Sequence, residues 1–278
     1  MKAIADALGV SRSNQYDKAK YQKRTHYKRT DDGYYLPMIR SIVDERPTYG
    51  YRRVTALLNR VLRTNGCPAV NHKRVYRLMR INGLLLQRYT GRSERVHNGV
   101  ITQDRSDLRW CSDIFEISCW NKERVRVAFS LDCCDREVMS YIATTGGICG
   151  NMIRDLMVES VECRFGKIDR LPHRIEWLSD NGPAYIAKET KRFAHIIGLT
   201  VRTTPYRSPE SNGMAESFVK TFKRDYVQLN PLPDAMSVMA KLNQWFNDYN
   251  EVHPHKGLKM MSPKEYRSFK SKLEECPV

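Results

Sequence analysis

The sequence predicts an α/β protein in which a mixed five-stranded sheet with flanking helices follows small all-α units. Two observations support this fold class. From about residue 107 onward, three strand-like segments are followed by alternating helix-like and strand-like segments, an order that gives a mixed sheet with helices on its faces. Before residue 87, apolar residues recur at helical spacing without any strand signal.

Charge is distributed unevenly along the chain. The 278 residues are enough for about two domains, and 41% hydrophobic residues favour packed cores. Residues 1–100 hold 21 Lys and Arg against 7 Asp and Glu, whereas the rest holds 26 against 24. This asymmetry indicates a polyanion-binding arm attached to a nearly neutral domain, with a merely soluble basic surface as the alternative.

Several classes of protein are disfavoured. The chain has no apolar run near the ~20 residues of a membrane span and no signal peptide, so we expect a cytoplasmic protein without a membrane partner. Its eight cysteines include no Cys-x-x-Cys pair. We therefore expect reduced, buried thiols and not a structural zinc site.

The first segment, residues 1–33, has a helix-turn-helix pattern and a basic connector. Gly9 is expected to make the turn and Ser11 to cap the second helix, which would present Arg12 and Gln15 to a DNA groove. An ordinary helical hairpin is the alternative. Because the pattern begins at the fourth residue, a helix before it would have to come from an upstream segment.

Residues 34–86 predict a second helical DNA-binding unit. Pro47 ends its first helix, and Tyr49 to Arg53 open the second. Asn71 is placed to cap the third helix, and Gly83 to end it. Basic residues without interleaved acids favour DNA contact over a solvated face; they are Arg52 and Arg53 in the second helix and Lys73, Arg74, Arg77 and Arg80 in the third.

The remaining boundaries follow from composition and periodicity. Residues 87–106 lack periodicity and form a linker, residues 107–227 form the α/β core, and residues 228–278 form a helical segment that packs on it. Strands are expected at 109–117, 125–134, 137–143, 175–178 and 199–204. Helices are expected at 151–163, 185–197 and 234–249, with a further one carrying Glu216.

Three acids of this core are placed to converge. Asp113 is embedded in a strand-like apolar run, and Asp180 follows a strand before Asn-Gly. Glu216 lies on a helix after a loop, with 35 residues between it and Asp180. Charged residues are rarely buried without a partner or a metal. A few carboxylates can hold Mg²⁺, which prefers oxygen ligands, so the three form a candidate catalytic and metal-binding triad.

Other acids in the core have simpler interpretations. Asp132 and Asp135 flank a predicted hairpin turn, where Asp is favoured for its hydrogen bonds to the backbone. Glu116 lies three residues after Asp113 on the same strand, so it points to the opposite face. Glu176 begins its strand and is expected to be solvated.

The motifs around the triad resemble those of a known family, the OrfB-type transposases of bacterial insertion sequences, whose catalytic domain is similar to retroviral integrase. The 35-residue gap between the last two acids is this family's spacing. The resemblance covers most of the chain and rests on Trp110-x-x-Asp113, Ser179-Asp180-Asn181-Gly182, Ser208-Pro209-x-Ser211-Asn212-Gly213-x-x-Glu216, Pro47 to Arg53, Lys73 to Arg77 and His253-Pro254-His255 to Tyr266.

This resemblance implies a ribonuclease-H-like fold and two-metal phosphoryl transfer on DNA with Mg²⁺, for which Mn²⁺ can substitute. Asp113 would bridge the two ions, while Asp180 would hold one and Glu216 the other. Asn212 would shape the loop before the catalytic helix, and Lys223 would hold a phosphate.

The implied reaction cuts insertion-element ends and joins their 3′-hydroxyls to target DNA. Its partners would be double-stranded DNA, further copies of the chain, and an upstream-frame protein or frameshift fusion. Two alternatives stay open, a nuclease of the same fold and a catalytically silent DNA-binding regulator. The chain lacks the paired His/Cys zinc module of retroviral integrase, so His253 and His255 are expected to serve packing or capping.

Overall fold

The computed structural model describes residues 30–87, 103–168, 170–203 and 213–275. The predicted helix-turn-helix pattern, with Arg12 and Gln15, lies outside the described residues. So do Asn212 and most of the predicted linker. No helix in the described ranges has both the length and the apolar composition needed to cross a bilayer.

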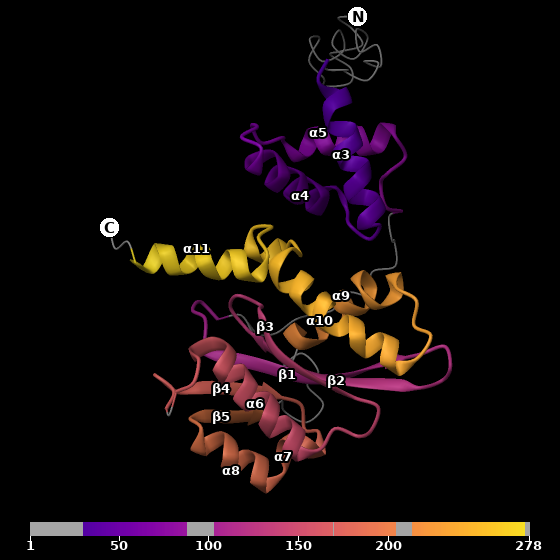
Figure 1. Cartoon of the computed structure of the whole chain (residues 1–278). Coiled ribbons are helices and arrows are strands. Elements are labelled where there is room, and N and C mark those ends of the chain that lie inside the picture. The colour runs from indigo at the N-terminus through magenta and orange to yellow at the C-terminus, as the bar shows by residue number, and fades with distance from the viewer. Residues whose placement is uncertain (1–29, 88–102, 169, 204–212, 276–278) are drawn as a thin grey trace, which may run out of the picture.

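The core is the expected mixed five-stranded sheet, with strand order β3-β2-β1-β4-β5 (Figure 1). β1 pairs antiparallel with β2, and β2 with β3, whereas β4 is parallel to both β1 and β5. The three consecutive antiparallel strands followed by parallel ones agree with the predicted order. The bounds are β1 Arg109–Ser118, β2 Arg124–Asp132, β3 Val138–Thr144, β4 Ile175–Ser179 and β5 Leu199–Thr203.

Helices cover both faces of the sheet because successive strand residues point to opposite sides. Trp110 of β1 packs in a core formed with α6 and α8, and the neighbouring Cys111 packs in a second core formed with α9 and α10. Figure 1 shows α6, α7 and α8 on one side of the sheet and α9 and α10 on the other. The bounds are α6 Gly150–Phe165, α7 Pro183–Ile186, α8 Lys188–Ile196, α9 Gly213–Asp225 and α10 Ala235–Glu251.

The single helix predicted at 185–197 is wrong, because the chain forms two helices there. Ala187 has an extended backbone, with φ −52° and ψ 134°, and it separates α7 from α8. The break leaves Tyr185 buried under the sheet, where its hydroxyl lies 2.7 Å from Ser112 Oγ of β1. This hydrogen bond ties α7 to the residue beside Asp113.

The second helical unit has its own core around Ile39, Leu58 and Val75. As predicted, the Asn71 side chain caps the third helix by accepting from the backbone N–H of Lys73, at 2.9 Å, and Gly83 follows that helix with φ +67°. The bounds are α3 Asp32–Glu45, α4 Tyr51–Thr64 and α5 His72–Ile81.

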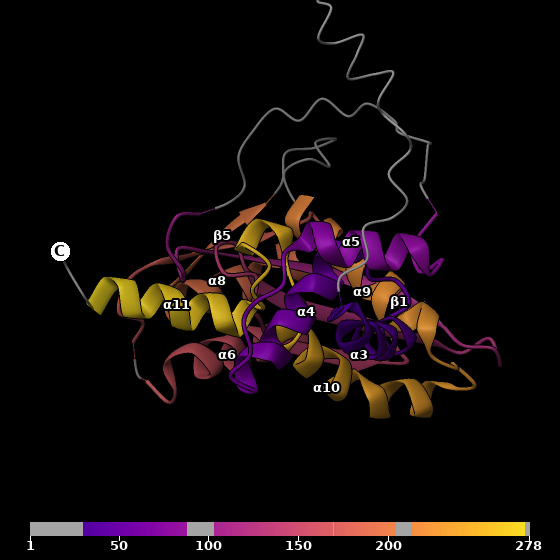
Figure 2. The ribbon, with the colours of Figure 1, turned by 90° about the horizontal axis from the view of Figure 1, so that it is seen from above.

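The helical unit lies over α9 and α10, on the side away from the sheet (Figures 1 and 2). The chain after α9 forms a short 3-10 helix, Val227–Leu229, and a second one, Lys256–Leu258, follows α10. α11 (Pro263–Glu275) begins with a capping box, in which the Ser262 N–H donates to the Glu265 carboxylate and the Glu265 N–H donates to Ser262 Oγ.

The described cysteines only partly match the expectation of buried thiols. All of them are free, and Cys111, Cys119, Cys133 and Cys134 are buried. Cys149, just before α6, and Cys163, near its end, are exposed, and Cys67 is partly exposed.

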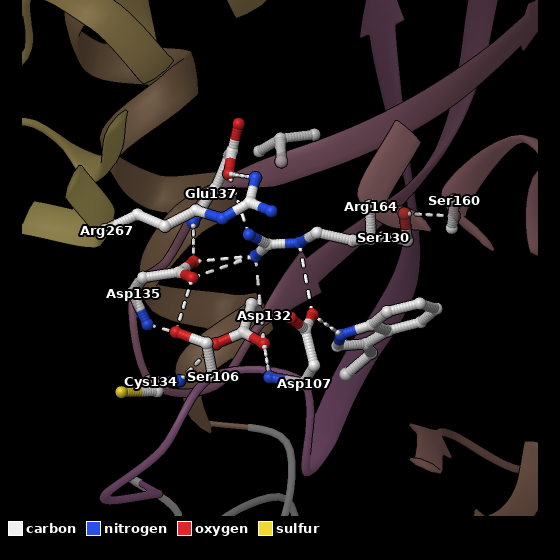
Figure 3. Close-up of polar contacts among 12 residues, drawn as sticks. Ser106, Asp107, Ser130, Asp132, Cys134, Asp135, Glu137, Ser160, Arg164 and Arg267 are labelled. Atoms are coloured by element: carbon white, nitrogen blue, oxygen red, sulfur yellow. Dashed lines mark hydrogen bonds and ion pairs between the residues drawn. The ribbon is translucent and has the colours of Figure 1, made fainter. Parts of the chain in front are cut away.

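The turn between β2 and β3 is held by a buried arginine that the sequence interpretation missed. One carboxylate oxygen of Asp132 accepts from the backbone N–H groups of Cys134 and Asp135, at 2.7 and 3.0 Å, which confirms its predicted role in the turn. Arg164 of α6 contacts this turn with its guanidinium, which lies 2.8 Å from Asp135 (Figure 3).

Arg164 lies within ion-pair distance of four carboxylates. Its guanidinium also contacts Glu137 at 2.9 Å and Asp107 at 3.2 Å, and lies 3.7 Å from Asp132. Burial, followed by the charge of Asp135, raises the pKa of Asp132 to about 7. The hairpin therefore depends on Arg164 for its charge balance, because Asp132, Asp135 and Glu137 are buried.

We expect Arg164→Met to lower the free energy of unfolding by about 3–5 kcal/mol, because it leaves buried carboxylates without their cation. Urea denaturation of the full chain at pH 7.5 measures this loss. Arg267→Met is the matched control: Arg267 reaches the same Glu137 at 3.0 Å from a 34% exposed position, so its loss should be under about 1 kcal/mol. Equal losses in the two variants would contradict the assigned role of Arg164.

Candidate functional site

Asp113 lies on the face of β1 that α9 and α10 cover. Its neighbours on that face of the strand, Cys111 and Phe115, are buried in the core shared with these helices. Asp113 itself is half-buried, and its carboxylate accepts from the backbone N–H of Ile114 at 2.8 Å. A rigid central strand therefore holds a carboxylate at the edge of an apolar core.

The register of the two parallel strands brings Asp180 beside Asp113. Cys111 of β1 is paired with Leu178 of β4, and both chains reach an Asp two residues later. Continued two residues past this pair, the alternation of side chains places both aspartates on the same side of the sheet. Asp180 is exposed just past the end of β4, and its carboxylate accepts from the Gly182 N–H at 3.0 Å, closing the Asn-Gly turn.

Glu216 reaches the same face from α9. It lies in the first turn of this helix, where the helix dipole favours a carboxylate, and it is partly buried. Phe218 and Phe222 of α9 are buried against Phe115 and Phe129 of the sheet. The packing thus sets the start of α9, with Glu216, near the strand positions of the two aspartates.

The charges of Asp180 and Glu216 both act on Asp113. The pKa of Asp113 is raised from 3.8 to about 6; the largest cause is burial, and the charges of Asp180 and Glu216 raise it further. Within the described ranges, no Lys or Arg forms an ion pair with Asp113 or Asp180. The one ion pair that the described residues offer to the predicted triad joins Lys220 to Glu216, at 4.0 Å.

The chemistry of the donors fits a divalent cation, although the donors are not gathered around one point. Among the described residues, no three His, Cys, Asp or Glu side chains lie close enough to hold a metal ion between them. All three acids, however, offer oxygen donors on one face. Mg²⁺ takes oxygen ligands, keeps several waters and is usually bound through one or two carboxylates, so it does not need an all-protein cage.

Lys223 also lies on the Asp113 face of β1. Its ammonium is 5.8 Å from the centre of the Phe115 ring, two residues along the strand from Asp113. The other acids of this region have partners of their own. Glu116 pairs with Arg126 at 2.7 Å, and Glu176, which was expected to be solvated, pairs with Arg109 at 2.6 Å.

The predicted DNA contacts of the helical unit divide into exposed and paired cations. Arg52 and Lys73 are exposed and form no ion pair with any described residue. Arg52 lines a cavity of about 400 Å³ between α4, α5 and the loop before α11. The other basic residues of this cavity are Arg60, Arg63, His72 and Lys259.

Arg74 and Arg77, by contrast, contact acids that the local sequence does not show. Arg74 lies 2.6 Å from Asp31 and 2.7 Å from Asp32, and Arg77 lies 2.6 Å from Asp32. These acids precede α5 by about 40 residues. The basic face of α5 therefore lacks acids within the helix itself, but acids from the start of α3 lie against it. The positive charge that this part of α5 offers to DNA is correspondingly reduced.

Arg53 is also turned inward. Its guanidinium contacts the buried carboxylate of Asp225 at 3.0 Å, while the preceding Arg52 is exposed. Asp225 was missed by the sequence interpretation, although it carries a signal. It is an acid in the last turn of a helix, where the dipole disfavours negative charge, so it needs a cationic partner.

Comparisons with known families agree with these elements. Two models described as "Integrase core domain" match residues 103–209 and 197–263, and a model described as "HTH-like domain" matches residues 35–92. The first two cover the sheet, α6 to α10 and the three acids. The third covers most of α3 and all of α4 and α5.

Curated relatives are similar over most of the chain. The transposase InsD for insertion element IS2A/D/F/H/I/K of Escherichia coli is 51% identical over 239 residues, which are 85% of this chain and 79% of the relative. The transposase InsD for insertion element IS2-9 of Escherichia coli strain K12 has the same identity and covers 85% of this chain and 78% of its own.

Three solved structures are similar to this chain at lower sequence identity. A chain of the simian T-cell lymphotropic virus intasome is 13% identical with a TM-score of 0.49, over 82% of this chain and 73% of its own. The catalytic core domain of BIV integrase is 16% identical with a TM-score of 0.44, over 61% and 99%. The Mos1 transposase catalytic domain with Raltegravir and Mg is 16% identical with a TM-score of 0.43, over 61% and 79%.

The family models and the Escherichia coli relatives cover the same elements that carry the candidate site. Their agreement with the mixed sheet and with the separate helical unit decides the classification. The chain belongs to the family of insertion-element transposases, polynucleotidyl transferases in which a helix-turn-helix-like unit precedes a ribonuclease-H-like integrase core.

Proposed function

We propose that this transposase cuts the ends of its insertion element and joins the 3′-hydroxyls to target DNA by divalent-metal-dependent phosphoryl transfer. The observation that carries the proposal is the group of interacting carboxylates on one face of the sheet. Asp113 and Asp180 each follow the registered pair Cys111–Leu178 by two residues, and the charges of Asp180 and Glu216 both raise the pKa of Asp113. Acids that act on one another's charge, with Lys220 at 4.0 Å from Glu216 as their one ion pair among the described residues, suit a site that binds cations during its reaction.

Each acid has a role that follows from its position. Asp113 interacts with both of the other acids, so it is the one that two cations would share, while Asp180 and Glu216 would each hold one. Bound Mg²⁺ or Mn²⁺ would supply activation of a water or 3′-hydroxyl and stabilisation of the leaving oxygen. Lys223 lies on the same face and would contact a DNA phosphate near the site.

The helical unit would bind the phosphate backbone of double-stranded DNA through its exposed cations. Arg52 and Lys73 are available for this contact, and the basic cavity beside Arg52 extends the surface toward the loop before α11. Arg12, Gln15 and Asn212 remain predicted contacts outside the described residues. Because two element ends take part in one transposition event, we further propose that several copies act together on DNA.

We expect Asp113→Asn, Asp180→Asn and Glu216→Gln each to lower Mg²⁺- or Mn²⁺-dependent nicking of an element-end duplex by at least about 100-fold, because each removes a charged oxygen donor. DNA affinity should change little. Nicking is followed on a labelled duplex, and a target plasmid in the same reaction reports the joining of 3′-ends.

Glu116→Gln is the matched control, because Glu116 lies on the same strand but on the opposite face and pairs with Arg126. This variant should nick at close to the wild-type rate. Wild-type nicking by any of the three triad variants would refute the site, and nicking without joining would indicate a nuclease.

The raised pKa of Asp113 predicts a pH-dependent effect on stability. The folded-state pKa of Asp113, about 6, lies above the ordinary 3.8, so folding favours the protonated form. Above pH 6 Asp113 is ionised and destabilises the fold, whereas below pH 4 it is protonated in both the folded and the unfolded state and has no such effect. Asp113→Asn should therefore raise the free energy of unfolding at pH 7.5 by up to about 3 kcal/mol, and change it little near pH 4.

Cation binding supplies a second readout at the same residue. Millimolar Mg²⁺ should raise the Tm of the wild type at pH 7.5 more than at pH 5, because protonation of Asp113 competes with the cation. The Tm of Asp113→Asn should not respond in this way. Scanning calorimetry without DNA measures both effects, and an identical Mg²⁺ response in the two proteins would count against cation binding at Asp113.

Replacing exposed and paired cations should affect DNA binding differently. Arg52→Ala and Lys73→Ala should each lower the slope of log K against log salt by about one, because each removes a phosphate contact. Arg77→Ala should lower the slope less and reduce stability, because Arg77 pairs with Asp32. Equal slope changes in all three variants would show that the pairing does not persist on DNA.

A further inference from the structure

The helical unit is fastened to the catalytic core through a polar joint in which three side chains of the unit meet three of the core. The unit contributes residues around the start of α4, and the core contributes the end of α9, the end of α10 and the segment after it. The joint consists of Arg46, Tyr49 and Arg53 on one side and Asp225, Asp248 and His253 on the other.

Arg46 forms the shortest hydrogen bonds between the two sides of this joint. Its guanidinium donates to both carboxylate oxygens of Asp248, at 2.5 and 2.6 Å, and the Tyr226 hydroxyl donates to the same carboxylate at 2.8 Å. Two parallel hydrogen bonds fix orientation as well as distance. The end of α3 is therefore held at a defined position over α10.

Tyr49 fills the centre of the joint. Only 2% of its surface is exposed, and its hydroxyl shares a hydrogen bond of 2.8 Å with Nδ1 of the buried His253. The guanidinium of Arg53 lies 5.1 Å from the centre of the Tyr49 ring. The motif from Pro47 to Arg53 thus meets the motif that begins at His253, which gives both a structural role.

Arg53 links this centre to the catalytic helix. It contacts Asp225 at 3.0 Å, and the Asp225 side chain is only 1% exposed. Arg224 donates to the same carboxylate at 2.6 Å, from a side chain that is 48% exposed. The buried carboxylate at the negative end of the helix dipole therefore depends on the helical unit for one of its two cations.

The continuity of α9 connects this contact to the active site. Glu216 lies in the first turn of α9 and Asp225 is its last residue, nine residues or roughly 14 Å further along the axis. Phe218 and Phe222 fix the helix sideways against the sheet. Arg53 fixes its far end from the DNA-binding side, while the adjacent Arg52 faces the basic cavity.

We infer that Arg53 and Asp225 are positioning residues for the transposase reaction. They hold the helical unit rigidly against the helix that carries Glu216, so that DNA bound by α4 and α5 is held at a set distance from the three acids. This role replaces the DNA contact expected of Arg53 from the sequence. The inference rests on the active site proposed above.

The test compares full-length wild type with Arg53→Met, Asp225→Asn and the double variant, and with Arg53→Lys as the conservative change. Arg52→Met is the matched control on the neighbouring arginine. Three quantities are measured on a duplex of the element's terminal sequence: the nicking rate at saturating DNA, the DNA concentration at half-maximal rate, and the salt dependence of binding. Hydrogen exchange of the free proteins reports the mobility of α9.

Arg53→Met and Asp225→Asn should each lower the nicking rate at saturating DNA by about tenfold or more, with an unchanged salt slope, because the acids and the DNA lose their fixed relation. The double variant should be no slower than the slower single variant, and Arg53→Lys should recover part of the rate. Arg52→Met should instead raise the DNA concentration at half-maximal rate and lower the salt slope by about one.

Two results would overturn the inference. An Arg53→Met variant that lowers the salt slope as Arg52→Met does would make Arg53 a DNA contact. Fully additive losses in the double variant, or a wild-type rate in Asp225→Asn, would show that the pair does not act as a unit.

Hydrogen exchange separates a failure of this inference from a failure of the proposed chemistry. Exchange of the Gly213–Asp225 amides should rise about tenfold in Arg53→Met and Asp225→Asn and stay at the wild-type level in Arg52→Met. If the wild type does not nick but this pattern holds, the joint stands and the chemistry fails. If exchange of α9 is unchanged in all variants, the joint does not position α9.

Discussion

The parallel pairing of β1 with β4 is the constraint on which the candidate site depends. A shift of one residue would turn Asp180 to the other face of the sheet, because side chains alternate along a strand. The observed register, Cys111 against Leu178, puts both aspartates on the face covered by α9. Tyr185 secures this edge from the opposite face through its hydrogen bond to Ser112.

The acids of the candidate site and the buried acids elsewhere in the core differ in their charged neighbours. Four acids of the described residues are buried, and each lies within ion-pair distance of an arginine: Asp132, Asp135 and Glu137 at Arg164, and Asp225 at Arg53. Asp113 is half-buried and has acids for neighbours. The buried acids among the described residues each have an arginine partner, whereas neither Asp113 nor Asp180 has a described Lys or Arg within ion-pair distance.

The sequence predicted the order and type of the core elements because these depend on local periodicity and turn residues. The five strands, the Asn71 cap and the turn at Asp132 all follow from residues near one another in the chain. The break at Ala187 could not be predicted in this way, because no Gly or Pro marks it and the buried contact of Tyr185 with β1 accompanies it. Arg164 escaped notice because its partners lie on another element.

By itself, the sequence determined which acids were candidates for the site and which segments carry them, since strand ends, the Asn-Gly turn and helix starts are local features. Only the tertiary structure decided what each arginine does. Arg52 and Arg53 are neighbours with the same chemistry, yet one lines a basic cavity and the other contacts Asp225, 172 residues away. Ion pairs between distant segments depend on how the helices pack, and no local pattern in the chain encodes that partner choice.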